Sequence, residues 1–291
     1  MSEPGAVRRI ELLQVRAPDV PPFVLALETQ SDRIIAPHIR ANAIWEAPET
    51  ALCRRLLRAG MCAVDAGAHA GYYSVLFSHL VGASGSVLAF EPHPANFRLL
   101  LANLLLNDCG NVQARPLALA ERDGSAWLHL SGDNAGDHRL AATPGRARVA
   151  VETIDLDTAL DGTAVDFIKI DTQGSEPRIL AGMSALLRAN QDRLGCLLEF
   201  APGLQQLAGT SVAQFAAQLD ALNARIFAIA LHDGVLELRR MNVLHDGLAK
   251  LAAELMRTWN GQVDASCDVF AVFGEAAEMS WLTRFREGAL G

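Results

Sequence analysis

Several common features are missing from this chain of 291 residues, and each absence excludes a class of protein. No run of 18 apolar residues occurs, and the start, MSEPGAVRRIELLQ, lacks the apolar stretch of a secretory signal. The five cysteines never stand in C-x-x-C spacing, so we expect buried thiols. The eight histidines form neither H-x-x-x-H nor H-E-x-x-H, which argues against a structural metal. These absences predict a cytoplasmic protein without a membrane span.

Clustered positive charge is missing as well. The formal net charge is −8, whereas phosphate binding needs a basic surface, so we expect no nucleic acid partner. With 51% hydrophobic and 20% charged residues the chain can bury a core. We predict one domain, made of an N-terminal extension or lid (1–60), an α/β core (61–275) and a C-terminal tail (276–291).

The stretch 61–73, MCAVDAGAHAGYY, organises this prediction. A short apolar run indicates a buried strand that ends at Asp65, and the turn after it carries Gly67 and Gly71 before an apolar helix. Glycines let a backbone approach a ligand closely, and a helix start offers unpaired N–H groups. The pattern therefore predicts a ligand site at this turn, although an ordinary strand-to-helix turn would show the same glycines.

The spacing of the turn selects among ligands. A dinucleotide turn, G-x-G-x-x-G, would need glycine where this chain has His69 and Tyr72. A nucleoside that carries an amino acid fits better, with its carboxylate on the loop amides and its ammonium near Asp65. The next predicted strand, 86–90, ends in Glu91, which is placed to accept both hydrogen bonds of a ribose diol. Together these features favour S-adenosylmethionine as the cofactor.

The rest of the chain continues the alternation of strand and helix. Three successive strand-helix units indicate a parallel sheet with right-handed crossovers, that is, an α/β fold. We predict strands over 23–27, 86–90, 111–119, 165–170, 196–200, 225–230 and 268–273, and helices over 49–59, 72–80, 96–107, 177–188, 212–222 and 245–259, with 96–107 buried on much of its surface.

An insertion interrupts this alternation between 121 and 160. Segments 126–130 and 146–153 read as strands of a hairpin or an added sheet, and the polar segment SGDNAGDHRL (131–140) joins them. A loop of this length in a compact fold is either disordered or functional. We interpret it as a gate that faces the substrate.

Three motifs resemble the FkbM-type S-adenosylmethionine-dependent methyltransferases: VDAGAHAGYYS, FEPHPANF and IKIDTQGSE. The resemblance covers about 45–200. It implies a Rossmann-like class I methyltransferase fold, with a mostly parallel sheet and helices on both faces, and an O-methyltransferase that acts on hydroxyls of natural products, sugars or polysaccharide units. The family's glycine loop usually reads G-A-N-I-G-Y, so His69 and Ala70 depart from it. Asn134 and Gly136 match a short N-x-G element of the family.

Carboxylates at the predicted strand ends are the candidates for chemistry. We assign catalytic roles to Asp171 (base or orienter of the acceptor), Glu199 and His138. Lys169 shares a strand face with Asp171 and is expected to pair with it or with Glu199. Asp171 and Glu199 together would suit a divalent cation, but no third oxygen ligand is evident, so no metal is assigned.

The cofactor-binding residues are predicted from the same segments. They are Glu46, Asp65, Gly67, Ala68, His69, Gly71, Tyr72, Tyr73, Glu91, Pro92, Asn96 and Ala118. The sequence thus predicts an O-methyltransferase that uses S-adenosylmethionine, releases S-adenosylhomocysteine and acts on a small-molecule or saccharide acceptor, as a monomer or a homodimer. Two alternatives stay open: a cofactor-binding regulatory or scaffold protein without methyl transfer, and an NAD-dependent oxidoreductase.

Overall fold

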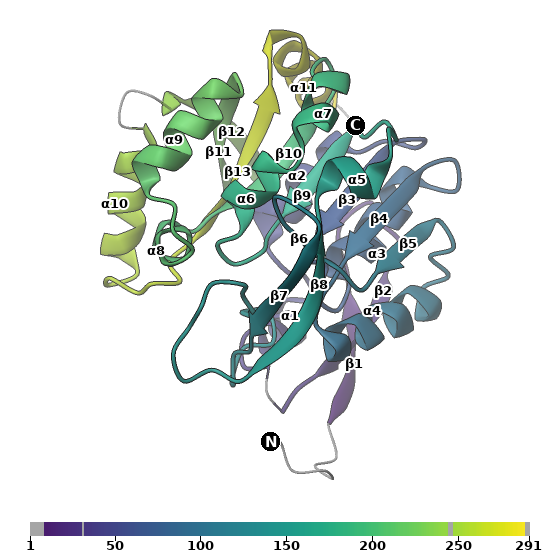
Figure 1. The fold of residues 1–291 in the computed structure, drawn as a ribbon. Helices are drawn as coiled ribbons and strands as arrows, with labels where there is room; N and C mark the ends of the chain where they lie inside the picture. The colour runs from purple at the N-terminus through teal and green to yellow at the C-terminus, as the bar shows by residue number, and fades with distance from the viewer. Residues whose placement is uncertain (1–8, 31, 244–246, 289–291) are drawn as a thin grey trace.

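An eight-stranded sheet runs through the middle of the molecule in the computed structural model, which describes residues 9–30, 32–243 and 247–288 (Figure 1). Its order is β12-β11-β13-β10-β9-β3-β4-β5. The strands are β3 (Cys62–Ala66), β4 (Ser86–Phe90), β5 (Val112–Arg115), β9 (Phe167–Ile170), β10 (Gly195–Phe200), β11 (Ala224–His232), β12 (Val235–Met241) and β13 (Cys267–Phe273).

Two hydrophobic cores lie on opposite faces of this sheet, because neighbouring residues of a strand point to opposite sides. Within β3, for example, Ala63 packs into one core and Val64 into the other. One core is covered by α1 (Ile35–Asn42), α2 (Ala47–Leu56), α3 (Tyr72–Val81), α4 (Pro94–Leu106) and α11 (Glu275–Glu287). The other is covered by α5 (Leu156–Leu160), α6 (Glu176–Ala181), α7 (Ser184–Ala189), α9 (Val212–Ala221) and α10 (Leu248–Thr258), while α8 (Pro202–Leu207) follows β10.

The strand directions confirm a Rossmann-like α/β fold. Strands β5, β4, β3, β9 and β10 pair in parallel, whereas β13, β11 and β12 pair antiparallel at the far side. The chain passes from β3 to β4 on one side and later returns to β9 on the other. Such a reversal opens a crevice at the carboxyl ends of the strands, where ligands bind in open α/β sheets.

Some predicted elements differ from those observed. The predicted strand 111–119 is divided, because Pro116 cannot donate to a sheet ladder: β5 stays in the large sheet and β6 (Ala118–Leu119) joins a small one. The predicted helix 177–188 is divided at Gly182 into α6 and α7. The sequence reading missed β12, and His245, at the start of the predicted helix 245–259, lies outside the described residues.

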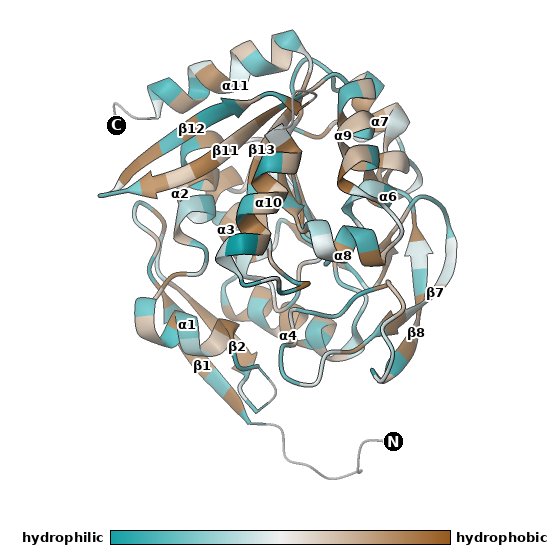
Figure 2. Cartoon of the chain, turned by 90° about the vertical axis from the view of Figure 1, so that its left-hand side faces the viewer, coloured by the Kyte–Doolittle hydropathy of each residue, from teal (hydrophilic) through white to brown (hydrophobic). Residues whose placement is uncertain are grey.

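Two further helices, α4 and α11, differ from the sequence prediction. In α4 the leucines at 101, 105 and 106 are 41%, 81% and 52% exposed, so the prediction that this helix is buried on much of its surface is wrong. Most of α11 (Glu275–Glu287) lies in the segment 276–291 that was expected to be a tail. This helix alternates polar and apolar residues in Figure 2 and buries Trp281 in the core. No helix among the described residues has the length and apolar character needed to cross a membrane.

The predicted hairpin is confirmed, and it belongs to a small sheet of order β6-β8-β7. Strands β7 (Gly124–His129) and β8 (Arg148–Ile154) pair antiparallel, and β6 pairs with β8 in parallel. The loop 131–140 extends from this sheet and contacts α4, for example through the hydrogen bond of 3.1 Å from Asn96 Nδ2 to Ala135 O.

An N-terminal hairpin of β1 (Ile10–Val15) and β2 (Phe23–Glu28) docks on α4 through buried amides. The Asn103 side chain accepts a hydrogen bond from Ala26 N (2.6 Å) and donates to Ala26 O (3.0 Å) and to Ala70 O (2.7 Å). Asn107, one turn later, makes the same pair of bonds with Val24 N (2.9 Å) and Val24 O (2.8 Å). The two asparagines thereby pair with the open edge of β2 and fix the loop before α3.

Asn103→Leu is expected to lower the free energy of unfolding by about 3 kcal/mol, because it leaves an N–H and two carbonyl groups buried without partners. Denaturant unfolding measures this loss. Asn42→Leu, on the exposed end of α1, is the matched control and should change the free energy by less than about 0.5 kcal/mol. Equal stability of the two variants would contradict the docking role of Asn103.

Candidate active site

Two adjoining cavities lie where β3, β4, β9 and β10 end. We call them the narrow cavity, of about 50 Å³, and the wide cavity, of about 470 Å³. Both are lined by Gly67, His69, Gly136, Asp171 and Gln173. A ligand that reaches from one cavity into the other must therefore pass these residues.

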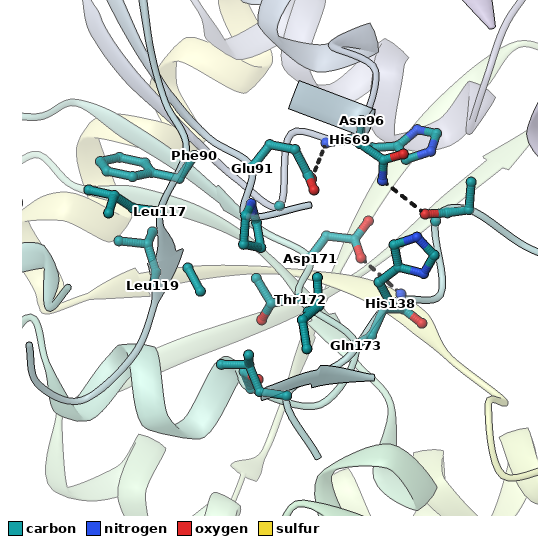
Figure 3. A pocket seen from close by; sticks show the side chains of 18 residues that line it. His69, Phe90, Glu91, Asn96, Leu117, Leu119, His138, Asp171, Thr172 and Gln173 are labelled. Carbon is teal, nitrogen blue, oxygen red and sulfur yellow. Dashed lines mark hydrogen bonds between the residues drawn. The ribbon is translucent and has the colours of Figure 1, made fainter. Parts of the chain in front are cut away.

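The narrow cavity has an apolar end and a polar end (Figure 3). Phe90, Leu117 and Leu119 gather at the apolar end, which suits a flat aromatic group. Glu91 and Asn96 lie at the polar end, toward Asp171. The predicted cofactor residues Pro92 and Ala118 also line this cavity.

Glu91 is held rigidly at the end of β4 and is 5% exposed. One carboxylate oxygen accepts a hydrogen bond from His69 N (2.9 Å) and the other from His93 N (2.7 Å). Burial raises the pKa of Glu91 to about 7. Each oxygen of an ionised carboxylate has a further lone pair, so Glu91 can accept two more hydrogen bonds from a ligand in the cavity.

The turn after β3 is folded tightly by its own backbone. The N–H groups of Gly67 and Ala68 both donate to Phe90 O, at 3.0 and 2.9 Å, and that of Gly71 donates to Ala68 O at 2.7 Å. The N–H groups of Gly67, Ala68 and Gly71 therefore already have backbone partners, so a ligand carboxylate at this turn would have to use other amides. A Cβ on Gly67 would lie 1.9 Å from Asp171 O, so this glycine allows two turns of the chain to touch.

Gly71, which the sequence predicted to bind the cofactor, is not among the described residues that line the two cavities. A Cβ on Gly71 would lie 2.7 Å from Leu100 Cδ1. Its glycine character brings α3 close to α4. Ala68 lines the wide cavity, as predicted for a residue near the ligand.

A buried ion pair lies where the two cavities meet. Lys169 Nζ is 2.6 Å from Asp171 Oδ2, as the sequence predicted, and it sits 4.5 Å from the centre of the Tyr73 ring. Burial acts to raise the pKa of Asp171, but the Lys169 ammonium and the hydrogen bonds from Lys169 and Gln173 lower it overall. Asp171 is therefore a fixed carboxylate, suited to orient a hydroxyl group.

The turn after β9 places Asp171 and Gln173. Glu176 accepts hydrogen bonds from Thr172 N (3.0 Å) and Gly174 N (3.1 Å), so its carboxylate shapes the turn. Gln173 Nε2 then donates both to Asp171 Oδ1 (3.1 Å) and to Glu199 Oε1 (3.0 Å). This glutamine, which links two predicted site residues, was missed because its role depends on the turn geometry.

Asp65 lines the wide cavity at the end of β3 and is 2% exposed. It accepts a hydrogen bond of 2.6 Å from Ser74 Oγ of α3. Burial raises the pKa of Asp65 to about 6. Its charge is thus available to a cation near neutral pH.

The N-terminal extension covers the wide cavity from the other side. Glu46 accepts a hydrogen bond of 2.7 Å from the Tyr73 hydroxyl, and Trp45 N donates to the Tyr72 oxygen at 3.2 Å. All four side chains line the wide cavity. The segment before α2 therefore lies over the predicted site, which is the position expected of a lid.

Two histidines, His69 and His138, line the narrow cavity, and His93 lies beside His138. The His138 Nδ1 atom accepts a hydrogen bond from Ser131 N (3.1 Å), and its ring centre is 4.4 Å from that of His93. Burial and the neighbouring histidines lower the pKa of His138 to about 3, so its imidazole is neutral. His69 Nε2 is buried without a hydrogen-bond partner, and burial lowers the pKa of His69 as well.

No group of three or more metal-ligating side chains suited to an ion occurs in the parts of the chain that the structure describes. The residues at the site are acidic and neutral, with Lys169 as the cation that lines the wide cavity.

Comparison with known proteins gives the following similarities. Residues 65–217 match the family model described as the methyltransferase FkbM domain. A protein-L-isoaspartate O-methyltransferase from Triticum aestivum is 29% identical over 103 residues, which is 35% of this chain and 39% of that protein. The chain thus matches well under half the length of this curated relative.

Solved structures with a similar fold include a precorrin-6y C5,15-methyltransferase from Geobacter metallireducens (TM-score 0.43, 13% identity, 79% of this chain and 88% of that one). Another is the O-methyltransferase TomG from Streptomyces achromogenes in complex with SAM (TM-score 0.42, 10% identity, 80% of this chain and 82% of that one).

Proposed function

This chain belongs to the FkbM methyltransferase family, and from that premise we propose that it transfers the methyl group of S-adenosylmethionine to a hydroxyl of a small molecule, sugar or natural product. The observation that carries the proposal is the position of Glu91. Glu91 is a buried carboxylate at the end of β4. It directly follows Phe90, which lines the apolar end of the narrow cavity, and it lies beside the turn after β3. Such a carboxylate recognises a ribose diol.

The lining of the two cavities supports an assignment of each part of the cofactor to a group of residues. The apolar end of the narrow cavity would hold the adenine, Glu91 the ribose, and Asp65 in the wide cavity the ammonium of the amino-acid tail. Gly67 lines both cavities, and its missing Cβ lets the turn after β3 lie against Asp171 where the two cavities meet. The cofactor's reactive centre would then face Asp171.

The chemistry that bound S-adenosylmethionine supplies is an electrophilic methyl carbon: the acceptor oxygen bonds to it as the carbon–sulfur bond breaks, sulfur keeps the electron pair, and the hydroxyl proton passes to a base. The protein's task is to hold the acceptor in line and to accept that proton. Asp171, fixed by Lys169 and Gln173, would orient the hydroxyl.

The proton acceptor that we propose is His69 Nε2. This atom is unpartnered, its imidazole is neutral near pH 7, and the residue lines both cavities. His138, which the sequence suggested as a candidate base besides Asp171, lines the narrow cavity, and its Nδ1 atom accepts a hydrogen bond from the backbone. His69 is therefore better placed for an acceptor in the wide cavity.

The test compares ligands for the purified protein. S-adenosylhomocysteine should raise the melting temperature and bind with a dissociation constant in the micromolar range, whereas NAD should do neither, because a ligand that binds only the native state stabilises it. Release of S-adenosylhomocysteine in the presence of hydroxylated acceptors then measures turnover. Binding of NAD in place of S-adenosylhomocysteine would support the oxidoreductase alternative. Binding of S-adenosylhomocysteine without methyl transfer to any acceptor would support a regulatory or scaffold protein.

A further inference from the structure

More carboxyl side chains line the wide cavity than the proposed function requires. Glu46, Glu49, Glu199 and Asp268 line it in addition to Asp65 and Asp171. We call these four side chains the carboxylate chamber. Methyl transfer to a neutral hydroxyl needs a base and an orienting group, and both are already assigned outside the chamber.

The fold gathers the chamber around one lysine. Asp65 and Lys169 are register partners on β3 and β9, and Glu199 of β10 is the register partner of Asp268 on β13. Since β13 runs antiparallel, the start of this strand meets the carboxyl end of β10. Glu46 and Glu49 approach the same space from the N-terminal extension.

Glu199 points independently to a missing ligand. Its Oε1 atom accepts from Gln173, but its Oε2 atom is buried and has no hydrogen-bond partner, while the residue is 5% exposed and lines the cavity. A buried acceptor without a donor is costly, so native structures rarely keep one without a reason. A donor brought by a ligand would satisfy it.

The charges of the cofactor do not account for this oxygen. The ammonium of the amino-acid tail is assigned to Asp65, and Lys169 balances Asp171. The sulfonium brings one positive charge but no N–H group, so it cannot donate a hydrogen bond to Glu199. The chamber retains an excess of carboxyl groups after the cofactor is placed.

We propose that the acceptor carries a protonated amino group beside the hydroxyl that is methylated, and that Glu199 and Asp268 bind this ammonium. Amino sugars and amino alcohols are the matching chemical class. The inference rests on the proposed function and specifies its substrate. An ammonium has three donors, which suits convergent carboxylates, and a charge-assisted bond is about twice as strong as a neutral one.

The raised pKa values of the carboxyl groups in the chamber agree with this assignment. Burial, and then the neighbouring carboxylates Asp171, Glu176 and Asp268, raise the pKa of Glu199 well above its ordinary value. Burial raises that of Asp268 too, with Glu46, Asp171 and Glu49 acting in the same direction and Lys169 opposing. A cation that enters the chamber lowers these pKa values and takes the place of bound protons.

The experiment uses the full chain saturated with S-adenosylhomocysteine and two matched pairs of probes: glucosamine against glucose, and ethanolamine against ethylene glycol. Calorimetry or ligand-observed NMR gives the dissociation constants. We expect the dissociation constant of each amine to be lower than that of its neutral partner by a factor of about ten or more, which corresponds to one charge-assisted contact. The preference should disappear when the pH is raised above the pKa of the amine.

Glu199→Gln and Asp268→Asn test the assignment, since both keep the shape of the side chain and remove its charge. Each should reduce the preference for the amine about tenfold. Asp264→Asn is the matched control: Asp264 also lines the wide cavity, but it is exposed, so solvent screens its charge and the preference should persist.

The outcomes separate the two proposals. If S-adenosylhomocysteine does not bind, the proposed function itself fails. If it binds and the amines show no preference over the neutral probes, or none of the probes binds, the amine inference alone is overturned. A preference that survives both Glu199→Gln and Asp268→Asn also overturns it, provided that unchanged binding of S-adenosylhomocysteine shows that the variants are folded.

Discussion

Glu91→Ala is expected to weaken the binding of S-adenosylhomocysteine by two to three orders of magnitude at pH 8. The substitution removes two charge-assisted hydrogen bonds to the ribose, each worth about 1.5–3 kcal/mol, and about 1.4 kcal/mol corresponds to a factor of ten. Isothermal titration calorimetry measures the change. Because the substitution also frees His69 N and His93 N, the melting temperature must be recorded to confirm that the variant is folded at the temperature of the titration.

The pH dependence of binding gives this prediction a second readout. The pKa of Glu91 in the free protein is raised to about 7. Only the ionised carboxylate accepts from both hydroxyls, so affinity should rise from pH 6 to pH 8 and then level off. The stability of the ligand-free protein should change in the opposite direction: a raised pKa means that the native state favours the neutral acid, so this contribution is present below pH 4.5 and is lost as the pH rises through 7.

Glu91→Gln separates charge from shape, since its affinity should be lower and should lack the rise around pH 7. The control is Glu237→Gln, an exposed position on β12, which should leave both the affinity and its pH profile unchanged. Wild-type affinity in Glu91→Gln would show that the nucleoside lies elsewhere, and the assignment of the narrow cavity would fail.

Gly67→Ala is expected to have the largest effect on the fold of the site. A Cβ there would lie 1.9 Å from Asp171 O, and the residue has a φ of +87°. A backbone oxygen cannot rotate away as a side chain can, so the turns after β3 and β9 must separate. We expect a loss of about 3 kcal/mol or more in the free energy of unfolding, from overpacking together with a left-handed backbone, and a loss of measurable cofactor binding.

Gly145→Ala isolates the backbone part of this effect. Gly145 has a φ of +80° and no atom within 4 Å of the added Cβ, so the substitution carries the left-handed strain alone, about 1–2 kcal/mol. Chemical denaturation and calorimetry on both variants give the comparison. Similar stability of the two variants, or normal binding in Gly67→Ala, would contradict the idea that close contact of the two turns builds the site.

The sequence was sufficient for most of the elements and for the ends of four strands. Short apolar runs predicted β3 and β4, and the carboxylates at their ends, Asp65 and Glu91, line the cavities. The reason is local: a short apolar run bounded by turn residues favours a buried strand, and parallel strands bring their carboxyl ends to one edge of the sheet. The pairing of Lys169 with Asp171 follows from the same alternation.

Only the tertiary structure decided how the site is closed. Asp268 is the second residue of β13, which is distant from β10 in sequence. It meets Glu199 because β13 lies antiparallel between β10 and β11. Gln173 bridges two carboxylates because Glu176 bends the turn before α6. Strand order and turn geometry depend on contacts between residues far apart in the chain, and hydrophobic patterning along a single segment carries no information about them. The sequence thus determined which side chains stand at the strand ends, and the packing of the sheet determined which of them share one cavity.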